Sequence, residues 1–469
     1  MGVEMRIFPD KARLQAFVRA FQSDRRGATA VVFTLSFAML APVGIGIFDV
    51  YVATQQHAKL QDALDAATLY AARTTALDNA SIDAAGDKAL AANLQLIQGA
   101  SLNGSSFSLA GNTVVGQATV TLPAFAPTVF THAPITVNSE VQRAGNNVEV
   151  ALVLDNSTSM AGASLTALKS SANTLVDLVV SDAQTPYYSK VSIIPYGNGV
   201  NVGAYAAHAR GATQSGTNGT SGTNGSPPYD NFKFKNPSGT KITLAVSTCV
   251  SERTGPEAYS DASPATATVG LNYPATANGN PCISAQMAPL SSDKTTIKTS
   301  ISNLTSCCST AGHVGIAWGW YTLSPKWNGL FTGNSAPAAY GAPHTIKSLV
   351  LMTDGEYNSV YCKGVIAQMA ANSSSTGSGS DNDHINCDGT NGKDAYAQAQ
   401  SLCDAMKAPP NNIIIYTVGL NVLAKPQAQN LVNNCATDAK HVYLPADGTA
   451  MTIAFQSIAA DINRLRISH

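Results

Sequence analysis

The chain has 469 residues and few charges: 28 lysines and arginines and 29 aspartates and glutamates, together 12% of its residues, against about 25% in an average soluble protein. The formal net charge of −1 argues against a nucleic-acid-binding surface, which needs a basic excess. The 45% of hydrophobic residues exclude disorder throughout the chain. The length allows about three domains of roughly 150 residues each.

An uncharged apolar segment lies near the N-terminus. Residues 27–48 read GATAVVFTLSFAMLAPVGIGIF, and a helix of this length spans about 33 Å, enough to cross the hydrocarbon core of a bilayer. The segment is longer than the apolar core of a signal peptide and continues into a helical pattern without a small-residue cleavage site. We therefore predict a retained transmembrane helix over residues 27–50 and disfavour a cleaved signal sequence.

The charges around this segment predict its orientation. Residues 1–26 carry more basic than acidic side chains, and the first basic residue beyond the span is Lys59. By the positive-inside rule, residues 1–26 form a cytoplasmic arm and the rest of the chain lies outside the cytoplasm. The basic residues of the arm are Arg6, Lys11, Arg13, Arg19, Arg25 and Arg26.

The cysteines agree with export, because all 8 lie beyond the predicted span. An even number of cysteines in an exported region favours disulfides. A zinc site is disfavoured because the chain has no CxxC pair. Many pairings are open, and proximity in the sequence favours Cys249–Cys282 and Cys403–Cys435. The other cysteines are Cys307, Cys308, Cys362 and Cys387.

Residues 51–146 are predicted to form a small α+β stalk region. Apolar residues at three- and four-residue spacing continue the first helix over residues 51–77. Its Ala-rich stripe fits either packing on its own domain or a lateral contact with pilin-like partners. Ser81 is a candidate N-cap for a second helix that ends near Ile97. Residues 105–142 alternate and are rich in Val and Thr, which is typical of strands.

From residue 147 onward, apolar strands alternate with helices, which predicts a doubly wound α/β domain over residues 147–469. Its first strand is the run VEVALVL, typical of a buried parallel strand. Two segments rich in Gly, Ser, Thr and Asn, at about 203–300 and 372–393, are predicted surface insertions. Further strands are predicted at 190–197, 346–352 and 412–420, with helices at about 163–180 and 449–466.

Oxygen-bearing side chains follow these strands, at the edge where open α/β sheets bind ligands. The first strand ends in DNSTS, and the alternation directs Asp155, Ser157 and Ser159 toward one point. Asp354 comes directly after a second strand, and Thr310 precedes a helical segment. Carboxylates and hydroxyls suit Mg²⁺, Mn²⁺ or Ca²⁺ better than zinc. Helix capping is the alternative role for Asp and Ser here, but capping alone does not require the alternation together with Asp354.

Three segments together resemble the metal-ion-dependent adhesion site of von Willebrand factor A domains: DNSTSM, the loop that contains Thr310, and MTDGEYN. The resemblance covers about residues 147–469 without the insertions. It implies a von Willebrand A-type sheet and a bound divalent cation, with Mg²⁺ expected and Mn²⁺ or Ca²⁺ as alternatives. It also implies one coordination position that stays open for a carboxylate of a partner.

The same resemblance assigns roles to individual residues. The two serines and the threonine contact the metal directly or through water, and the two aspartates support them. The family usually has Gly-Gly-Thr or a similar sequence at the threonine, whereas this chain reads CCST, and Thr305 is the alternative to Thr310. The implied metal site consists of Asp155, Ser157, Ser159, Thr310 and Asp354.

A second resemblance lies in the N-terminal part. The sequence RRG at 25–27, the apolar span and the segment HAKLQDALDAATLYAA resemble the head of Tad (Flp) pilus-assembly proteins, whose TadG-like members join this head to a von Willebrand A domain. The order of parts implies a single-pass protein of a bacterial inner membrane, with the bulk periplasmic or surface-exposed. Related TadE-type pseudopilins carry a glutamate five residues after the processing-site glycine. Here that position is Val32, so processing after Gly27 is not expected.

These features predict a membrane-anchored, extracytoplasmic, metal-dependent protein-binding component of a Tad/Flp-type pilus assembly or adhesion system. Its partner presents an acidic side chain and is a pilus or pilus-assembly component. The motifs HExxH, GxSxG and GxxxxGK[ST] are absent, and His313 is expected to be a packing or rim residue, so no enzyme is predicted. The alternatives are an adhesin that binds a host or surface ligand directly and, disfavoured because no base is placed, a metal-dependent hydrolase.

Overall fold

A computed structural model describes most of the chain and divides it into two compact units, Met1–Arg143 and Ala144–His469. Cys362, Cys387 and the predicted insertion at 372–393 lie outside the described residues. The described residues are 15, 19, 28–123, 133–218, 228–235, 241–274, 281–358, 365–368 and 394–467, without positions 75, 77, 96, 98, 111, 112, 144 and 356.

One long helix, α2 (Ala28–Arg73), contains the predicted membrane span from Ala28 onward and most of the predicted helix that follows it. The part from Val31 onward is long and apolar enough to cross a membrane, with a mean hydropathy of 2.2 in its most apolar window and none of that window buried. Pro42 lies inside the helix, which transmembrane helices tolerate. This length and composition are those of a membrane anchor, and a signal sequence near an N-terminus shares them.

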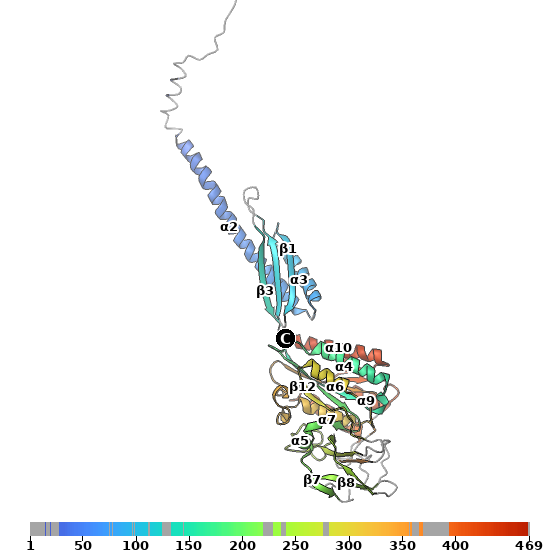
Figure 1. Cartoon of the computed structure of the whole chain (residues 1–469). Coiled ribbons are helices and arrows are strands. Elements are labelled where there is room, and N and C mark those ends of the chain that lie inside the picture. The colour runs from blue at the N-terminus through green and yellow to red at the C-terminus, as the bar shows by residue number, and fades with distance from the viewer. Residues whose placement is uncertain are drawn as a thin grey trace, which may run out of the picture. The chain divides into compact units, whose positions relative to one another are not determined.

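The rest of the first unit is a small α+β body packed on the C-terminal part of α2 (Figure 1). Helix α3 and an antiparallel sheet of order β1-β2-β3 enclose a core that includes Leu60, Leu64, Ala67 and Phe107. The elements are α3 (Asn79–Leu94), β1 (Ser101–Ala110), β2 (Thr113–Thr121) and β3 (Ile135–Gln142).

Helix α3 begins earlier than the sequence predicts. Its N-cap is Asp78, whose carboxylate accepts a hydrogen bond from the Ser81 N–H at 2.8 Å. The prediction of Ser81 as the cap was therefore wrong. Asp and Ser are both favoured caps, and the helix runs from Asn79 to Leu94 instead of ending near Ile97, so it is shifted toward the N-terminus and not lengthened.

A six-stranded sheet of order β12-β5-β4-β13-β15-β16 forms the centre of the second unit. All neighbours pair in parallel except the edge strand β12, which is antiparallel to β5. This confirms the predicted doubly wound, von Willebrand A-type α/β fold. The strands are β4 (Asn147–Asp155), β5 (Ser189–Tyr196), β12 (Ala288–Ser291), β13 (Thr345–Thr353), β15 (Ile414–Gly419) and β16 (Val442–Tyr443).

Helices cover both faces of this sheet, which explains the continuous apolar run in β4. Leu152 and Leu154 point into the core with α4, α6 and α10, whereas Ala151 and Val153 point into the core with α7, α8 and α9. Figure 1 shows α4 beside α10. The helices are α4 (Ala163–Val179), α6 (Lys294–Ser302), α7 (Gly312–Leu323), α8 (Ala395–Lys407), α9 (Pro426–Cys435) and α10 (Gly448–Ile467).

The segment 203–300 is more than the predicted surface insertion. Its C-terminal part supplies the edge strand β12 and helix α6, whose Ile297 and Ile301 are buried at a helical four-residue spacing. The polar composition of the whole segment hides these few apolar positions. The remaining small elements are β6 (Val200–Asn201), α5 (Ala206–Arg210), β7 (Gln214–Asn218), β8 (Tyr229–Lys235), β9 (Lys241–Ala245), β10 (Cys249–Ser251), β11 (Gly270–Pro274) and β14 (Val365–Gln368).

Disulfides join both cysteine pairs that proximity favours. Cys249 and Cys282 have Cα atoms 5.6 Å apart, and Cys403 and Cys435 have Cα atoms 5.2 Å apart. The first pair closes the insertion onto itself, and the second ties α8 to α9. The neighbours Cys307 and Cys308 form a further disulfide, which the sequence did not predict.

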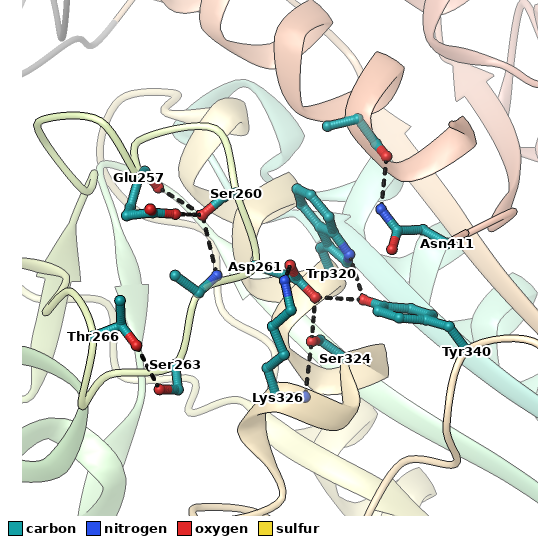
Figure 2. Close-up of polar contacts among 12 residues, drawn as sticks. Glu257, Ser260, Asp261, Ser263, Thr266, Trp320, Ser324, Lys326, Tyr340 and Asn411 are labelled. Carbon is teal, nitrogen blue, oxygen red and sulfur yellow. Dashed lines mark hydrogen bonds and ion pairs between the residues drawn. The ribbon is translucent and has the colours of Figure 1, made fainter. Parts of the chain in front are cut away.

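A buried carboxylate fixes the insertion against α7 and the segment after it (Figure 2). Asp261, 2% exposed, accepts hydrogen bonds from Ser324 Oγ at 2.5 Å, Lys326 Nζ at 2.7 Å and Tyr340 Oη at 2.7 Å. Trp320 Nε1 in turn donates to Tyr340 Oη at 2.8 Å. Burial alone would raise the pKa of Asp261, but the bonds from Lys326, Ser324 and Tyr340 outweigh it, so the pKa is lowered and the carboxylate is ionised.

Candidate metal centre

The predicted site residues follow two neighbouring strands that end at the same edge of the sheet. Leu154 of β4 is opposite Met352 of β13 in a parallel register, so Asp155, which ends β4, and Asp354, which follows the last residue of β13, lie at the ends of adjacent strands. The chain leaves β4 for β5 on one side and returns to β13 on the other. The site therefore lies at a topological switch point, where open α/β sheets bind ligands.

A chain of hydrogen bonds links the two carboxylates through the two serines. Asp155 Oδ1 accepts from the Ser157 N–H at 2.8 Å. Ser157 Oγ lies 2.9 Å from Ser159 Oγ, and Ser159 Oγ donates to Asp354 Oδ1 at 2.8 Å. Asp155 is 0% and Asp354 is 8% exposed. Four of the five proposed ligands thus meet in one mostly buried cluster.

Thr310 is connected to this cluster through its backbone. Its N–H donates to Asn358 Oδ1 at 2.9 Å, and its carbonyl accepts from the Asn358 N–H at 3.1 Å. Asn358 follows Asp354 closely in the chain, so Thr310 is held beside the end of β13. Within the described part of the chain, the Thr310 hydroxyl makes no hydrogen bond to the other four site residues. The alternative, Thr305, is exposed, and its hydroxyl pairs with Ser284 Oγ at 2.8 Å.

Side chains that the sequence did not single out support both aspartates. Tyr196 Oη and Thr353 Oγ1 donate to Asp155 Oδ2 at 3.2 Å and 3.0 Å. Lys425 Nζ donates to the main-chain carbonyl of Asp354 at 2.7 Å. Tyr196 and Thr353 end strands at the same edge as Asp155, so their positions offered a signal. Lys425 follows β15 in a loop, and no spacing pattern connects it with the site.

Burial disfavours the charged form of both carboxylates. Burial first, and then the negative charge of Asp354, raise the pKa of Asp155 to about 6. Burial also raises the pKa of Asp354, although the hydrogen bond from Ser159 and the charge of Lys425 lower it. The two carboxylates contact different groups, and among the described residues no cation hydrogen-bonds to a side-chain oxygen atom of either one, so their negative charge is not compensated there.

A divalent cation fits this arrangement. The oxygen atoms of Ser157, Ser159 and Asp354 are hard ligands of the kind that Mg²⁺ and Mn²⁺ prefer, and a cation would supply the missing charge. The part of the chain that the structure describes has no group of three or more His, Cys, Asp or Glu side chains able to hold a metal. A metal at this edge would therefore depend on the hydroxyls, with Asp155 holding Ser157 in place.

His313, just after the loop that contains Thr310, is buried and does not lie at the rim of the candidate site. It is 1% exposed, and its Nε2 lies 2.6 Å from Glu252 Oε2. Glu252 comes from the insertion and is 5% exposed. The pair connects the insertion to α7 in the interior. Of the two roles expected for His313, the packing role is therefore confirmed and the rim role was wrong.

Substituting Gly312 should disturb the segment that carries Asp354. A Cβ at this position would lie 1.9 Å from Cζ of Tyr357, a buried ring stacked on Tyr396 with centroids 5.3 Å apart. We expect Gly312→Ala to lower the free energy of unfolding of this unit by about 1–3 kcal/mol, as overpacking does. Gly329→Ala is the control, because a Cβ there meets no atom within 4 Å. Equal unfolding curves for the two variants, followed by tryptophan fluorescence, would contradict this packing.

Comparison with known proteins gives a distant likeness in fold. No protein-family model and no curated protein matches the chain. Among solved structures, the chain is similar to the vWF domain of the type V pili tip protein Mfa5 from Porphyromonas gingivalis, with 13% identity, a TM-score of 0.38, and coverage of 69% of this chain and 97% of that one. It is also similar to the PilB minor pilin from Streptococcus sanguinis, with 11% identity, a TM-score of 0.35, and coverage of 78% and 79%.

A third similar structure is proximal thread matrix protein 1 from the mussel byssus, described with a zinc-occupied MIDAS motif. The identity is 9% and the TM-score 0.31, with 69% of this chain covered, and the chain spans 47% of that protein. The chain thus has a distant structural similarity to the vWF domain of a pilus tip protein and to a minor pilin. TM-scores at this level assign the chain neither a family nor a function.

Proposed function

We propose that this chain is a membrane-anchored, metal-dependent protein-binding component of a bacterial pilus system, of the Tad/Flp assembly type. It acts by binding and not by catalysis. The single observation that carries the proposal is the hydrogen-bonded series from Asp155 through Ser157 and Ser159 to Asp354 at the switch point of the sheet. The order of the parts along the chain also supports the proposal: an apolar N-terminal helix, a small α+β body and then the second unit, called the A-type unit below.

In this proposal each side chain has a separate task. Ser157, Ser159 and Asp354 hold the cation, with Thr310 as a further hydroxyl at the adjacent loop. Asp155 accepts the Ser157 N–H and so fixes the turn that presents both serines. The cation, when bound, supplies positive charge for a carboxylate of the partner. Lys425, bound to the Asp354 carbonyl, adds a second positive charge on the same side and favours an acidic partner.

The long apolar helix supports an anchoring role. The charge distribution of the sequence places residues 1–26 in the cytoplasm and the A-type unit outside it. We propose that α2 retains the protein in the inner membrane. The A-type unit then meets pilus or pilus-assembly components in the periplasm or at the cell surface.

The functional test is a site variant in the bacterium that carries this chain. A deletion strain complemented with Asp354→Ala should produce few pili or attach poorly, as the deletion does, because the cation that bridges the partner is lost. Complementation with Asp182→Ala is the matched control, because this side chain is 92% exposed and pairs only with Lys294 among the described residues. Electron microscopy counts the pili.

Normal piliation and attachment in the deletion strain would contradict the proposed function. Full rescue by Asp354→Ala would contradict the role of the site while leaving a role for the protein. Surface labelling of intact cells distinguishes the adhesin alternative, since a protein confined to the periplasm stays unlabelled and an adhesin is labelled.

A further inference from the structure

The Cys307–Cys308 disulfide differs from the two other described disulfides in its exposure and its place. Both of its residues are partly exposed, whereas Cys403 and Cys435 are fully buried. Cys249 is also fully buried, so its pair with Cys282 has one partly exposed residue, whereas Cys307–Cys308 has two. Because thiol–disulfide exchange requires access to a sulfur atom, a reductant reaches Cys307–Cys308 most readily among these three pairs.

This disulfide lies in the loop that leads to Thr310. It directly contacts the loop of residues 156–159, which carries Ser157 and Ser159 and is called the metal loop below. The Cys307 N–H donates to the Asn156 carbonyl at 2.7 Å. The Cys308 carbonyl accepts two hydrogen bonds from Thr158, one from its N–H at 3.0 Å and one from its hydroxyl at 2.9 Å. Thr158 stands between the two serines of the proposed site. The position of Cys308 therefore fixes where Ser157 and Ser159 lie.

The backbone at Cys308 has a conformation that cysteine rarely adopts. Its φ is 70°, in the left-handed region that residues other than glycine, asparagine and aspartate rarely adopt. The bond between adjacent cysteines closes a small ring that includes their shared peptide group, and this ring restricts the backbone of Cys308. Opening the ring removes that restriction, so the backbone can relax to an ordinary φ and turn the carbonyl away from Thr158.

The Cys308 thiol that reduction forms has a hydrogen-bond acceptor nearby. Cys308 Sγ lies 3.4 Å from the Pro281 carbonyl oxygen. The disulfide sulfur has no hydrogen to donate, whereas the thiol formed by reduction does. Reduction thus gives Cys308 a hydrogen bond to the insertion that can hold it there after its carbonyl has turned away from Thr158.

We propose that Cys307–Cys308 is a reversible redox site that sets the cation affinity of the metal centre. A dithiol reductant donates two electrons and two protons: its thiolate attacks one sulfur, a mixed disulfide forms, and its second thiol displaces the cysteine. The products are two cysteine thiols and the oxidised reductant. The oxidised chain holds the cation, and reduction releases it. This inference rests on the proposed metal site.

The test uses the full-length chain in detergent micelles. In one aliquot, graded dithiothreitol followed by alkylation and peptide mass spectrometry identifies which pairs open. In a parallel aliquot that is not alkylated, the reductant is removed and free Mn²⁺ is measured by electron paramagnetic resonance. We expect Cys307 and Cys308 to be alkylated while the other two described pairs stay intact. The Mn²⁺ affinity should then fall by at least about tenfold, since two hydrogen bonds to the metal loop are lost, and return on reoxidation.

Two double variants complete the test. Cys307→Ser with Cys308→Ser should bind Mn²⁺ as weakly as the reduced chain and no longer respond to the reductant. Cys403→Ala with Cys435→Ala should keep both the affinity and the response. Unchanged affinity after selective reduction, or simultaneous opening of the buried pairs, would overturn the redox site but leave the metal site standing. Absence of Mn²⁺ binding in the oxidised chain would overturn both.

Discussion

Replacing Asp155 with asparagine should weaken Mg²⁺ and Mn²⁺ binding by about 10–100-fold, the usual cost of removing a residue that positions metal ligands. The fully buried Asp155 carboxylate accepts hydrogen bonds from the Ser157 N–H, Thr353 and Tyr196. An asparagine amide keeps the shape of the side chain but removes its negative charge. Its NH₂ group would also point hydrogens at groups that donate hydrogen bonds to the carboxylate. Titration calorimetry with either cation measures the change.

The same substitution should leave the sheet folded. Burial already raises the pKa of Asp155, so a neutral side chain removes an unfavourable buried charge and need not reduce stability. Asp182→Asn is the matched control, since the Asp182 side chain is 92% exposed. We expect this variant to bind the cation with the same affinity as the unsubstituted chain. Equal affinities in all three proteins would rule Asp155 out of the cation site.

Replacing Lys347 with methionine should lower the free energy of unfolding of the second unit by about 3–5 kcal/mol, the cost of breaking a buried ion pair on one side. Lys347 Nζ donates to Glu149 Oε2 at 2.5 Å and to the Leu323 carbonyl at 2.9 Å. The side chains are 5% and 0% exposed. Without Lys347, the Glu149 carboxylate loses its directly bonded cation in the interior of the sheet. All 3 tryptophans lie buried in this unit, so denaturant unfolding followed by their fluorescence reports its stability.

Two further variants separate the ion pair from general packing. Lys190→Met should cost about 1 kcal/mol or less, because this lysine is partly exposed and its Nζ lies 3.5 Å from the Ala336 carbonyl. Adding Glu149→Gln to Lys347→Met should recover stability, because the amide oxygen still accepts from Tyr188 Oη and the Ala338 N–H without a buried charge. No recovery in the double variant would show that the lysine acts through its methylene groups.

The sequence was informative wherever burial on both faces leaves a local pattern. The run from Val148 to Leu154 is apolar throughout because helices cover both sides of β4, and so the strand and the fold class could be predicted. The insertion was misread because only isolated apolar side chains, such as Ile297 and Ile301, enter the core from a polar segment. Composition averaged over such a segment conceals them.

The side chains that cluster at the candidate site could be singled out from the sequence, whereas the contacts that support them could not. The spacing of Asp155, Ser157 and Ser159 is local, and it survives as a hydrogen-bonded series in the structure. The contacts from Lys425 to Asp354 and from Cys308 to Thr158 join loops far apart in the chain. They depend on the order of strands in the sheet, which a single sequence does not reveal. The assignment of Thr310 as a ligand stays a prediction.

The most direct measurement of the central claim is anomalous diffraction from crystals of this protein grown with Mn²⁺. We predict an anomalous peak at the carboxyl end of β4 and β13, bounded by the oxygen atoms of Ser157, Ser159 and Asp354, and a weaker peak there in crystals of Asp155→Asn at the same, subsaturating Mn²⁺ concentration. A map without a peak at this edge at saturating Mn²⁺, or with the cation bound only elsewhere, would contradict the metal centre and the function proposed from it.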